Sequence, residues 1–288
     1  MIWMSDKWKD YEVLDTSDGE RLERWGKYFL VRPDPQVIWN TEKKDPRWRN
    51  YDARYLRSST GGGRWSDHDL PEHWQIRYRD YLTFNVKPMN FKHTGVFPEQ
   101  AANWDFIRET CANAGRPVRV LNLFAYSGGA TLAAAAGGAE VYHVDAAKGM
   151  VAWAKENAVA SGLADKPIHW IVDDCGKFIQ REIRRGRRYD GIIMDPPSYG
   201  RGPSGEIWKM ETSFYPFLLE TAKLLTDNPL FVIINSYTTG LAPSAVGYAA
   251  DVVYGSCHGG HTQVGELGLP VKSTGIMLPC GSAGRWTP

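Results

Sequence analysis

The stretch that decides the fold runs from Val120 to Thr131 and reads Val-Leu-Asn-Leu-Phe-Ala-Tyr-Ser-Gly-Gly-Ala-Thr. Residues 120–124 form a mostly apolar run, which suits a strand buried on both faces. The two adjacent glycines predict a tight turn, and the alanine-rich run 130–136 has high helix propensity. A strand, a glycine turn and a helix in this order bring backbone N–H groups and a helix N-terminus beside a bound ligand.

A second strand is predicted at residues 140–144 and ends at Asp145. An acidic side chain at this position can accept hydrogen bonds from both ribose hydroxyls of a nucleoside. A dinucleotide site would need G-x-G-x-x-G, because the backbone must approach a pyrophosphate closely. Residues 125–130 instead read Ala-Tyr-Ser-Gly-Gly-Ala, and Tyr126 would crowd a diphosphate. The pattern therefore favours a nucleoside ligand without phosphate, such as S-adenosylmethionine.

Another apolar strand, at 191–194, leads into Asp195-Pro196-Pro197-Ser198-Tyr199. Because proline lacks an N–H and fixes φ, the two prolines predict a rigid turn whose carbonyls stay free as acceptors. Asp195 and these carbonyls can hold a polar, planar substrate group, and Tyr199 can stack on a base.

The strand predicted at 168–172 is followed by Asp173 and Asp174. One of them can accept from the amino group of adenine, and we favour Asp174 for this role. The alternative for both residues is a helix N-cap, since aspartate before a helix is common.

Together these segments resemble a class I S-adenosylmethionine-dependent methyltransferase of the kind that modifies large-subunit ribosomal RNA. The resemblance rests on 122–129, Asp145, 173–174 and 195–199, and on Gly-Val-Phe-Pro-Glu-Gln at 95–100, a motif just upstream of the fold. It extends from about Gly95 to the C-terminus and implies S-adenosylmethionine as the cofactor. It also implies cofactor-binding and catalytic residues: Phe97, Gln100, Asn122, Phe124, Ala125, Tyr126, Ser127, Gly128, Asp145, Ala146, Asp173, Asp174, Cys175 and Asp195 for the cofactor, and Asp195, Pro196, Pro197 and Tyr199 for catalysis.

The chain is predicted to contain two domains that differ in their pattern of secondary structure. Residues 1–93 hold strand-like runs at 11–14, 28–31, 75–78 and 82–86, which indicates a small antiparallel β-rich domain. Residues 94–288 alternate predicted strands and helices, with final strands expected at 251–254 and 274–278. We therefore predict an α/β fold: a Rossmann-like class I methyltransferase sheet preceded by a small β-rich N-terminal domain.

A polar segment at residues 43–64 is the candidate RNA-binding site, and it is expected to be irregular. Cations interleave there with aromatic rings, as single-stranded RNA binding requires, because phosphates pair with cations and bases stack on rings. The alternative is a solvated loop whose aromatic side chains pack on the β-rich domain. The predicted RNA-binding residues are Arg47, Arg49, Arg54, Arg57, Trp48 and Tyr55.

Composition limits the partners and the cellular environment that can be expected. The formal net charge is +1, so attraction to a polyanion must come from a local patch. The four cysteines lack C-x-x-C spacing, which is typical of reduced thiols in the cytoplasm. The segment 257–261, Cys-His-Gly-Gly-His, offers too few ligands for a metal site, so we expect a loop. No apolar run approaches a membrane span, so a cytoplasmic protein without metal or membrane partner is expected.

The chemistry predicted from these motifs is methylation of a base nitrogen in ribosomal RNA. Asp195 or the Pro196 carbonyl would accept from the target group. Methylation at carbon 5 of cytosine would instead need a cysteine nucleophile, but positions 198–199 and 235–237 contain none. The alternatives are a non-catalytic module that binds S-adenosylmethionine and RNA, and a methyltransferase that acts on a small molecule.

Overall fold

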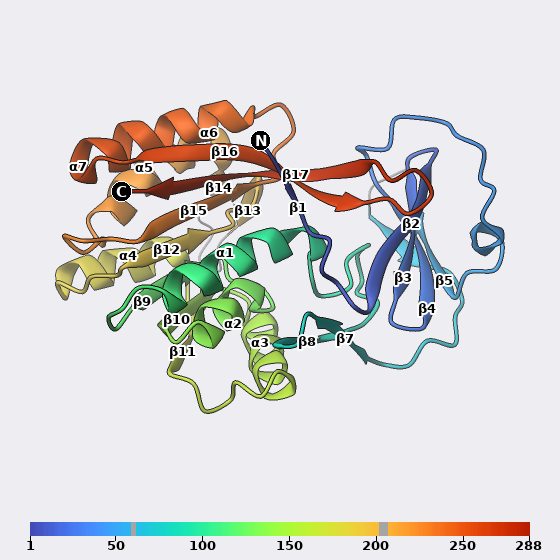
Figure 1. Ribbon diagram of the computed structural model, residues 1–288, viewed down its shortest axis with the longest axis horizontal. Helices are drawn as coiled ribbons and strands as arrows, with labels where there is room; N and C mark the ends of the chain where they lie inside the picture. Colours follow the sequence, from blue (N-terminus) through green and yellow to red (C-terminus); the bar gives the residue numbers. More distant parts are fainter. Residues whose placement is uncertain (59–61, 202–206) are drawn as a thin grey trace. The chain divides into compact units, whose positions relative to one another are not determined.

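The computed structural model describes residues 1–58, 62–201 and 207–288, and the chain forms two compact units (Figure 1). Unit 1 consists of Met1–Trp3, Ala102–Leu267 and Gly281–Pro288. Unit 2 consists of Met4–Ala101 and Gly268–Cys280. The domain boundary placed after residue 93 stays a prediction.

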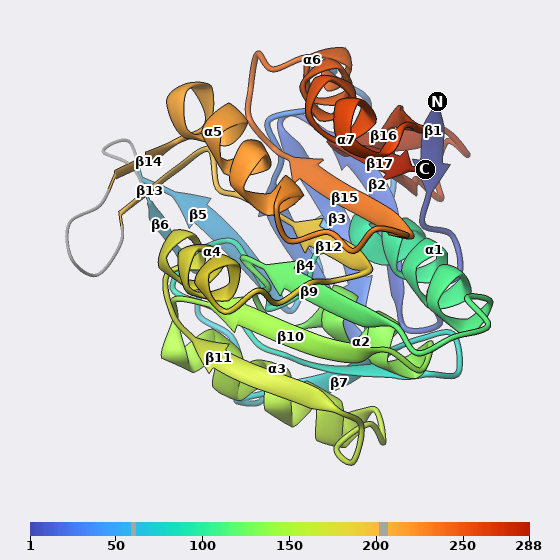
Figure 2. The same ribbon diagram turned by 90° about the vertical axis from the view of Figure 1, so that its left-hand side faces the viewer.

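Unit 1 contains most of an eight-stranded sheet with the strand order β1-β16-β17-β15-β12-β9-β10-β11. The five strands from β15 to β11 run parallel and lie side by side in Figure 2, whereas β17 runs antiparallel to β15. This arrangement confirms the predicted α/β sheet. The strands are β1 (Ile2–Met4), β9 (Arg119–Leu123), β10 (Glu140–Asp145), β11 (Ile168–Val172), β12 (Gly191–Met194), β15 (Phe231–Ser236), β16 (His261–Pro270) and β17 (Met277–Thr287), with a separate two-stranded ribbon β13 (Tyr199–Arg201) and β14 (Ile207–Lys209).

Helices cover both faces of this sheet, which is why its central strands are apolar almost without interruption. Leu121 and Leu123 pack with Phe178 and Phe217 on one face, whereas Asn122 bonds to Thr131 on the other. The helical segments are α1 (Ala101–Ala112), α2 (Gly129–Ala136), α3 (Lys148–Ala160), α4 (Cys175–Arg184), α5 (Met210–Ala222), α6 (Pro243–Ala250), the π-helical turn η3 (Asp251–Gly255) and α7 (Ser256–His258).

Unit 2 contains a five-stranded sheet of order β2-β3-β4-β5-β6 and a separate β7-β8 hairpin. Its pairings are antiparallel except for β4 with β5, which are parallel. The predicted β-rich architecture is therefore confirmed, with one parallel pair that the sequence did not indicate. The elements are β2 (Tyr11–Ser17), β3 (Glu20–Trp25), β4 (Tyr28–Pro33), η1 (Pro46–Trp48), β5 (Ala53–Arg57), β6 (Gly63–Trp65), β7 (Trp74–Tyr78), β8 (Leu82–Val86) and η2 (Pro98–Gln100).

Four secondary-structure expectations were wrong in whole or in part. One is the loop expected at 257–261, which includes the end of α7 and the first residue of β16. Residues 251–254 are helical rather than a strand, because Val253 and Tyr254 face the core while Val252 is exposed, a helical pattern that a short apolar run does not reveal. The last strand begins at Met277, after a turn at 272–274. The segment 43–64 is not irregular throughout, since it contains η1, β5 and part of β6; its residues 59–61 lie outside the described chain.

Candidate active site

Most of the predicted cofactor-binding and catalytic residues follow four parallel strands that end at one edge of the unit 1 sheet. Leu123, the last residue of β9, is paired with Val144 of β10 and with Met194 of β12. Asp145 is paired with Val172, the last residue of β11. Because parallel strands end at the same edge, the segments that follow all four strands emerge together there.

The turn after β9 adopts an unusual backbone conformation. Phe124 and Tyr126 have φ values of 55° and 51°, in the left-handed region that residues other than glycine rarely adopt. Such strain is commonly stored at ligand sites. The turn is held by a 3.1 Å bond from Ala125 N to the Val144 carbonyl and a 2.9 Å bond from Tyr126 N to Asp145 Oδ2.

The glycines after this turn let α2 begin close to its neighbours. Gly128 has a φ of 92°, and a Cβ there would lie 3.0 Å from the Ala154 Cβ. A Cβ on Gly129 would lie 2.5 Å from the Trp104 ring. Since the N-cap residue Gly128 has no side chain to accept from the first N–H groups, the start of α2 is suited to an anionic group such as a carboxylate.

Asn122, a predicted cofactor residue, is buried beneath this turn. Its Nδ2 donates to Thr131 Oγ1 at 2.8 Å, and Thr131 Oγ1 lies 2.9 Å from His143 Nδ1. Burial lowers the pKa of His143 to about 3, so the imidazole is neutral. Similarly, buried Asn157 donates to the carbonyl of Ser127 at 2.9 Å. Contacts of Asn122 and Ser127 with a cofactor stay predictions. The hydrogen bonds of Asn122 and Asn157 hold the turn to the buried residues beneath it.

Asp145 is half-buried beside the turn, and both of its carboxylate oxygens accept backbone N–H groups. Oδ2 accepts from Tyr126 at 2.9 Å, and Oδ1 accepts from Ala147 at 2.8 Å. Burial raises the pKa of this carboxyl, and the two N–H groups partly oppose that shift. Each carboxylate oxygen has a second lone pair, so the ribose hydroxyls of a nucleoside can still donate to it. Ala146, also predicted to contact the cofactor, is exposed directly after Asp145.

The two aspartates after β11 are engaged with the protein itself. Asp174 is the N-cap of α4 and accepts from Lys177 N at 2.9 Å, as the alternative interpretation proposed. Asp173 accepts from Asp174 N and forms an ion pair with Arg181. The cap does not occupy every acceptor position, so the adenine contact of Asp174 stays a prediction.

Cys175 begins α4 and supports the turn after β9. It is buried, and its Sγ accepts the Phe124 N–H at 3.3 Å. Burial raises the pKa of the thiol well above its usual range, so the sulfur stays protonated. The structure therefore gives Cys175 a supporting contact with Phe124, a residue predicted to touch the cofactor.

The turn after β12 is more firmly held than the sequence suggested. The Pro197 carbonyl was expected to be free, but it accepts the indole N–H of Trp208 at 2.6 Å. Pro196 is buried, and within the described chain its carbonyl accepts no hydrogen bond. Asp195 is half-buried, and Tyr199 is 52% exposed. Trp208 was missed because it follows the turn at no characteristic spacing.

Phe97 and Gln100 belong to unit 2, at η2 just before α1. Gln100 is buried, and its N–H donates to the Phe97 carbonyl at 3.1 Å. Their predicted contact with the cofactor stays a prediction.

The aromatic side chains proposed to stack on RNA are buried in unit 2. Trp48 is 7% exposed and Tyr55 is 5% exposed. Trp48 packs with Leu14 and Leu22, and its Nε1 donates to Asp15 Oδ2 at 2.7 Å. Because both rings are buried, they offer little face to a base, and the stacking role of Trp48 and Tyr55 stays a prediction that this burial does not support. The alternative, aromatics packed on the β-rich unit, describes both residues.

The four predicted RNA-binding arginines differ in their surroundings. Arg47 pairs with Asp45, and Arg54 pairs with Glu20 at 2.7 Å; we call these two the paired arginines. Arg49 and Arg57 are exposed and have no carboxylate partner within the described chain. The same holds for Arg64 on β6, which we add to form the unpaired arginines: Arg49, Arg57 and Arg64.

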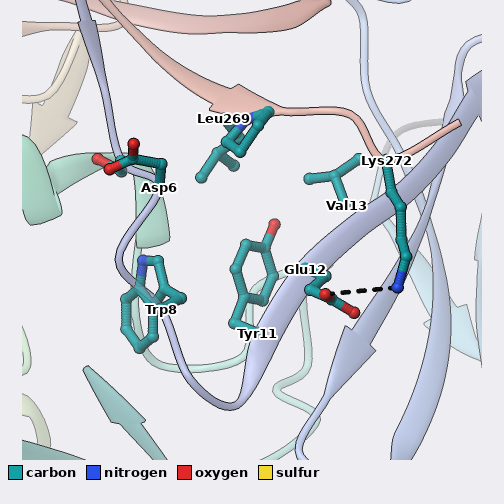
Figure 3. Close-up of a pocket in the computed structure, with 9 residues that line it drawn as sticks. Asp6, Trp8, Tyr11, Glu12, Val13, Leu269 and Lys272 are labelled. Atoms are coloured by element: carbon teal, nitrogen blue, oxygen red, sulfur yellow. Dashed lines mark ion pairs between the residues drawn. The ribbon is translucent and has the colours of Figure 1, made fainter. Parts of the chain in front are cut away.

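Unit 2 also contains a cavity of about 200 Å³ near β2 (Figure 3). Several of the polar groups that line it are already engaged within unit 2. Glu12 pairs with Arg24 and Lys272, and the Tyr11 hydroxyl donates to Glu23 at 2.6 Å. Glu23 is fully buried, which alone would raise its pKa, but Arg21 and Arg32 lower it to about 2. Glu23 is thus held in its charged form by Arg21 and Arg32.

The described residues contain no group of three or more His, Cys, Asp or Glu residues that could hold a metal ion. None of their helices combines the length and apolar composition needed to cross a membrane. In the segment 257–261, His261 Nδ1 pairs with Asp251 at 2.8 Å.

Comparison with known proteins decides the family. The family model of S-adenosylmethionine-dependent methyltransferases matches residues 39–225. The chain belongs to this family. A solved S-adenosylmethionine-dependent methyltransferase from Agrobacterium tumefaciens is 37% identical, with a TM-score of 0.93, over 100% of this chain and 93% of that one. A structure described as a methyltransferase complexed with S-adenosylhomocysteine shares the fold at 20% identity and a TM-score of 0.73, over 98% of this chain and 76% of that one.

Curated relatives of this methyltransferase are much longer proteins. Ribosomal RNA large subunit methyltransferase K/L of Shewanella frigidimarina is 29% identical over 155 residues, which are 53% of this chain and 21% of the relative. The enzyme of the same name from Shewanella baltica is 33% identical over 132 residues, 46% of this chain and 17% of the relative. The aligned region thus spans about one fifth of their length. The predicted family and cofactor are confirmed: this is an S-adenosylmethionine-dependent methyltransferase.

The residues at the sheet edge fit that cofactor. Asp145 supplies an anionic acceptor suited to ribose hydroxyls, and the start of α2 supplies N–H groups suited to the carboxylate of the methionine part. The tyrosine at position 126 stands where a pyrophosphate would have to approach. These features agree with a nucleoside that carries a carboxylate rather than a diphosphate.

Proposed function

We propose that this methyltransferase transfers a methyl group to a nucleobase nitrogen in large-subunit ribosomal RNA. The observation that carries the proposal is the turn after β12. This turn follows β12, whose last residue Met194 is paired with Leu123, so Asp195 and Pro196 follow a strand that ends at the same sheet edge as β9 and β10. Two acceptors on consecutive residues, the Asp195 carboxylate and the Pro196 carbonyl, would suit an amino or ring N–H group, which a base nitrogen presents and a carbon does not.

When bound, the cofactor supplies a methyl group on a positively charged sulfur. The chain's own contribution is to orient the nucleophile, exclude water and accept a proton. Asp195 and the Pro196 carbonyl would fix the plane of the target group, so that its nitrogen lone pair faces the methyl carbon. A half-buried carboxylate at Asp195 would accept the proton that the nitrogen loses.

Methylation of a pyrimidine carbon is less well supported by the site. That reaction requires a thiolate that attacks the base first. Of the four cysteines, all within the described chain, Cys175 alone follows one of these strand ends, and it is buried, protonated and bonded to Phe124. A nitrogen target therefore agrees better with the residues present.

The choice of RNA rests on the names of the curated relatives and on the unpaired arginines. These three residues are exposed on unit 2 with no carboxylate partner within the described chain, so they can pair with phosphates. The paired arginines would first have to leave Asp45 and Glu20. A ribosomal substrate would also place the enzyme in the cytoplasm.

Methyl-labelled S-adenosylmethionine tests the proposal directly. The protein is incubated with total RNA and, separately, with a protein-free small-molecule extract, and the RNA is then digested for nucleoside mass spectrometry. We expect label in RNA, on a base nitrogen of a large-subunit fragment. Label in the small-molecule fraction alone would overturn the choice of substrate, and label on a carbon or on ribose would overturn the choice of atom.

A further inference from the structure

One aromatic residue outside the predicted motifs connects the two turns of the site. Trp208 lies on β14, and its Nε1 donates to the Pro197 carbonyl at 2.6 Å. Its ring lies 5.4 Å from the Phe124 ring and 5.2 Å from the Phe217 ring, between centroids. Phe124 opens the turn after β9, and Pro197 belongs to the turn after β12. Trp208 therefore contacts both the turn after β9 and the turn after β12.

The local fold is shaped to allow this contact. In the ribbon β13–β14, Gly200 is paired with Trp208, and a Cβ on Gly200 would lie 3.3 Å from Pro197 Cγ. The absence of that side chain lets the strand pass close to the turn. Met210 N also donates to the Ser198 carbonyl at 3.1 Å, and Ser198 Oγ lies 2.8 Å from Thr238 Oγ1. The turn is thus anchored after its prolines by several bonds.

The two prolines fix φ but provide no N–H, so at these positions the turn has no backbone donor with which to bond to its surroundings. The Trp208 indole bonds to the turn from the other direction, by donating to the Pro197 carbonyl. This bond fixes the orientation of the peptide unit that follows Pro197. Because the Pro196 carbonyl and Asp195 precede it in the same rigid turn, fixing this unit also fixes the two acceptors proposed to hold the base.

We propose that Trp208 is a positioning residue. Its indole N–H fixes the position of the turn after β12 relative to the turn after β9. Methyl transfer should therefore depend on Trp208, whereas cofactor binding should not. The activity part of this inference rests on the proposed RNA substrate. The structural part does not, since it concerns a bond within unit 1.

Trp208→Phe removes the N–H and keeps a ring against Phe124. Trp286→Phe is the matched control, because the Trp286 indole also donates to a carbonyl, that of Gly259 at 3.2 Å, away from the turn. We expect Trp208→Phe to lower kcat on large-subunit ribosomal RNA about fivefold with an unchanged Kd for S-adenosylhomocysteine, since one hydrogen bond contributes about 1 kcal/mol. The control should keep kcat even where its stability falls. A wild-type kcat for Trp208→Phe, or equal losses in both variants, would overturn the proposal.

Amide hydrogen exchange provides a readout that needs no substrate. The Met210 N–H, bonded to the Ser198 carbonyl, reports on the turn. We expect its exchange to be about fivefold faster in Trp208→Phe than in the wild type or the control. Unchanged exchange would refute the anchoring role. If wild-type protein transfers no methyl group to RNA while Met210 exchange still responds, the proposed function fails and the anchoring role stands. Should Trp208→Phe fold poorly, the isosteric benzothienylalanine at position 208 removes the same N–H without changing the ring shape.

Discussion

Replacing Asp145 by asparagine separates its structural and cofactor-binding roles. Both carboxylate oxygens accept a backbone N–H in the native protein, from Tyr126 at 2.9 Å and from Ala147 at 2.8 Å. Asparagine offers one oxygen and one NH₂ group, so one of these N–H groups would face a donor. Asp145→Asn therefore disturbs the strained turn while leaving the size of the side chain unchanged.

The magnitudes follow from the bonds that are lost. A hydrogen bond to a charged group contributes about 1.5–3 kcal/mol, so loss of one bond should lower the free energy of unfolding by about 2 kcal/mol. Loss of the charged acceptor for the ribose hydroxyls should cost a similar amount of binding free energy. That corresponds to a Kd for S-adenosylhomocysteine raised roughly 10- to 150-fold.

Titration calorimetry measures the Kd, and urea denaturation measures the free energy of unfolding. Asp165→Asn, at an exposed aspartate in the loop after α3, makes the same chemical change and should alter neither quantity. A reduced stability with a Kd within twofold of wild type would remove Asp145 from the cofactor site. An unchanged stability would contradict the two backbone bonds themselves.

Three other outcomes are expected. Burial raises the pKa of Asp145. Affinity for S-adenosylhomocysteine should therefore increase as the pH rises through that pKa and the carboxylate forms, and it should then level off. If Asp145→Asn shows the same pH profile as the wild type, Asp145 is not the cause of the pH dependence. Trp48→Phe removes the bond to Asp15 and should lower the free energy of unfolding by about 2 kcal/mol at constant RNA affinity; weaker RNA binding at full stability would restore the stacking interpretation. Replacing all three unpaired arginines with alanine should make RNA binding less dependent on salt. In filter binding, the fall of log affinity with log salt should become shallower by about 2, at roughly 0.7 per phosphate contact. Alanine at the paired arginines is the control, and an equal change there would refute the distinction.

The sequence was sufficient for the parts of the fold that local patterns determine. The apolar run at 120–124, the glycines at 128–129 and the alanine-rich helix indicate a strand, a turn and a helix in their observed order. Asp145 and Asp195 follow apolar strands, and parallel strands end at a common edge. Their location at the same sheet edge therefore followed from topology.

Non-local contacts were beyond the same reasoning. The positive φ of Phe124 and Tyr126 is carried by residues that normally avoid it, so no propensity indicates it. The bond from Trp208 to Pro197 depends on the path of β13 and β14. The sequence predicted that Trp48 stacks on RNA, because aromatic residues among cations suit both RNA binding and packing in a small core. Only the burial of the side chain distinguishes these two interpretations, and burial depends on the folded chain.

Nucleoside mass spectrometry of RNA treated with wild-type protein or with Asp195→Ala tests the central claim most directly. Asp195 lies where the turn after β12 meets the sheet edge, and its N–H is 3.4 Å from the Leu123 carbonyl. The account predicts an N-methylated base with the wild type and almost none with Asp195→Ala, whose affinity for S-adenosylhomocysteine should fall much less than its rate of methyl transfer. A variant that methylates the same nitrogen at the wild-type rate would show that the turn is scaffolding and contradict the account.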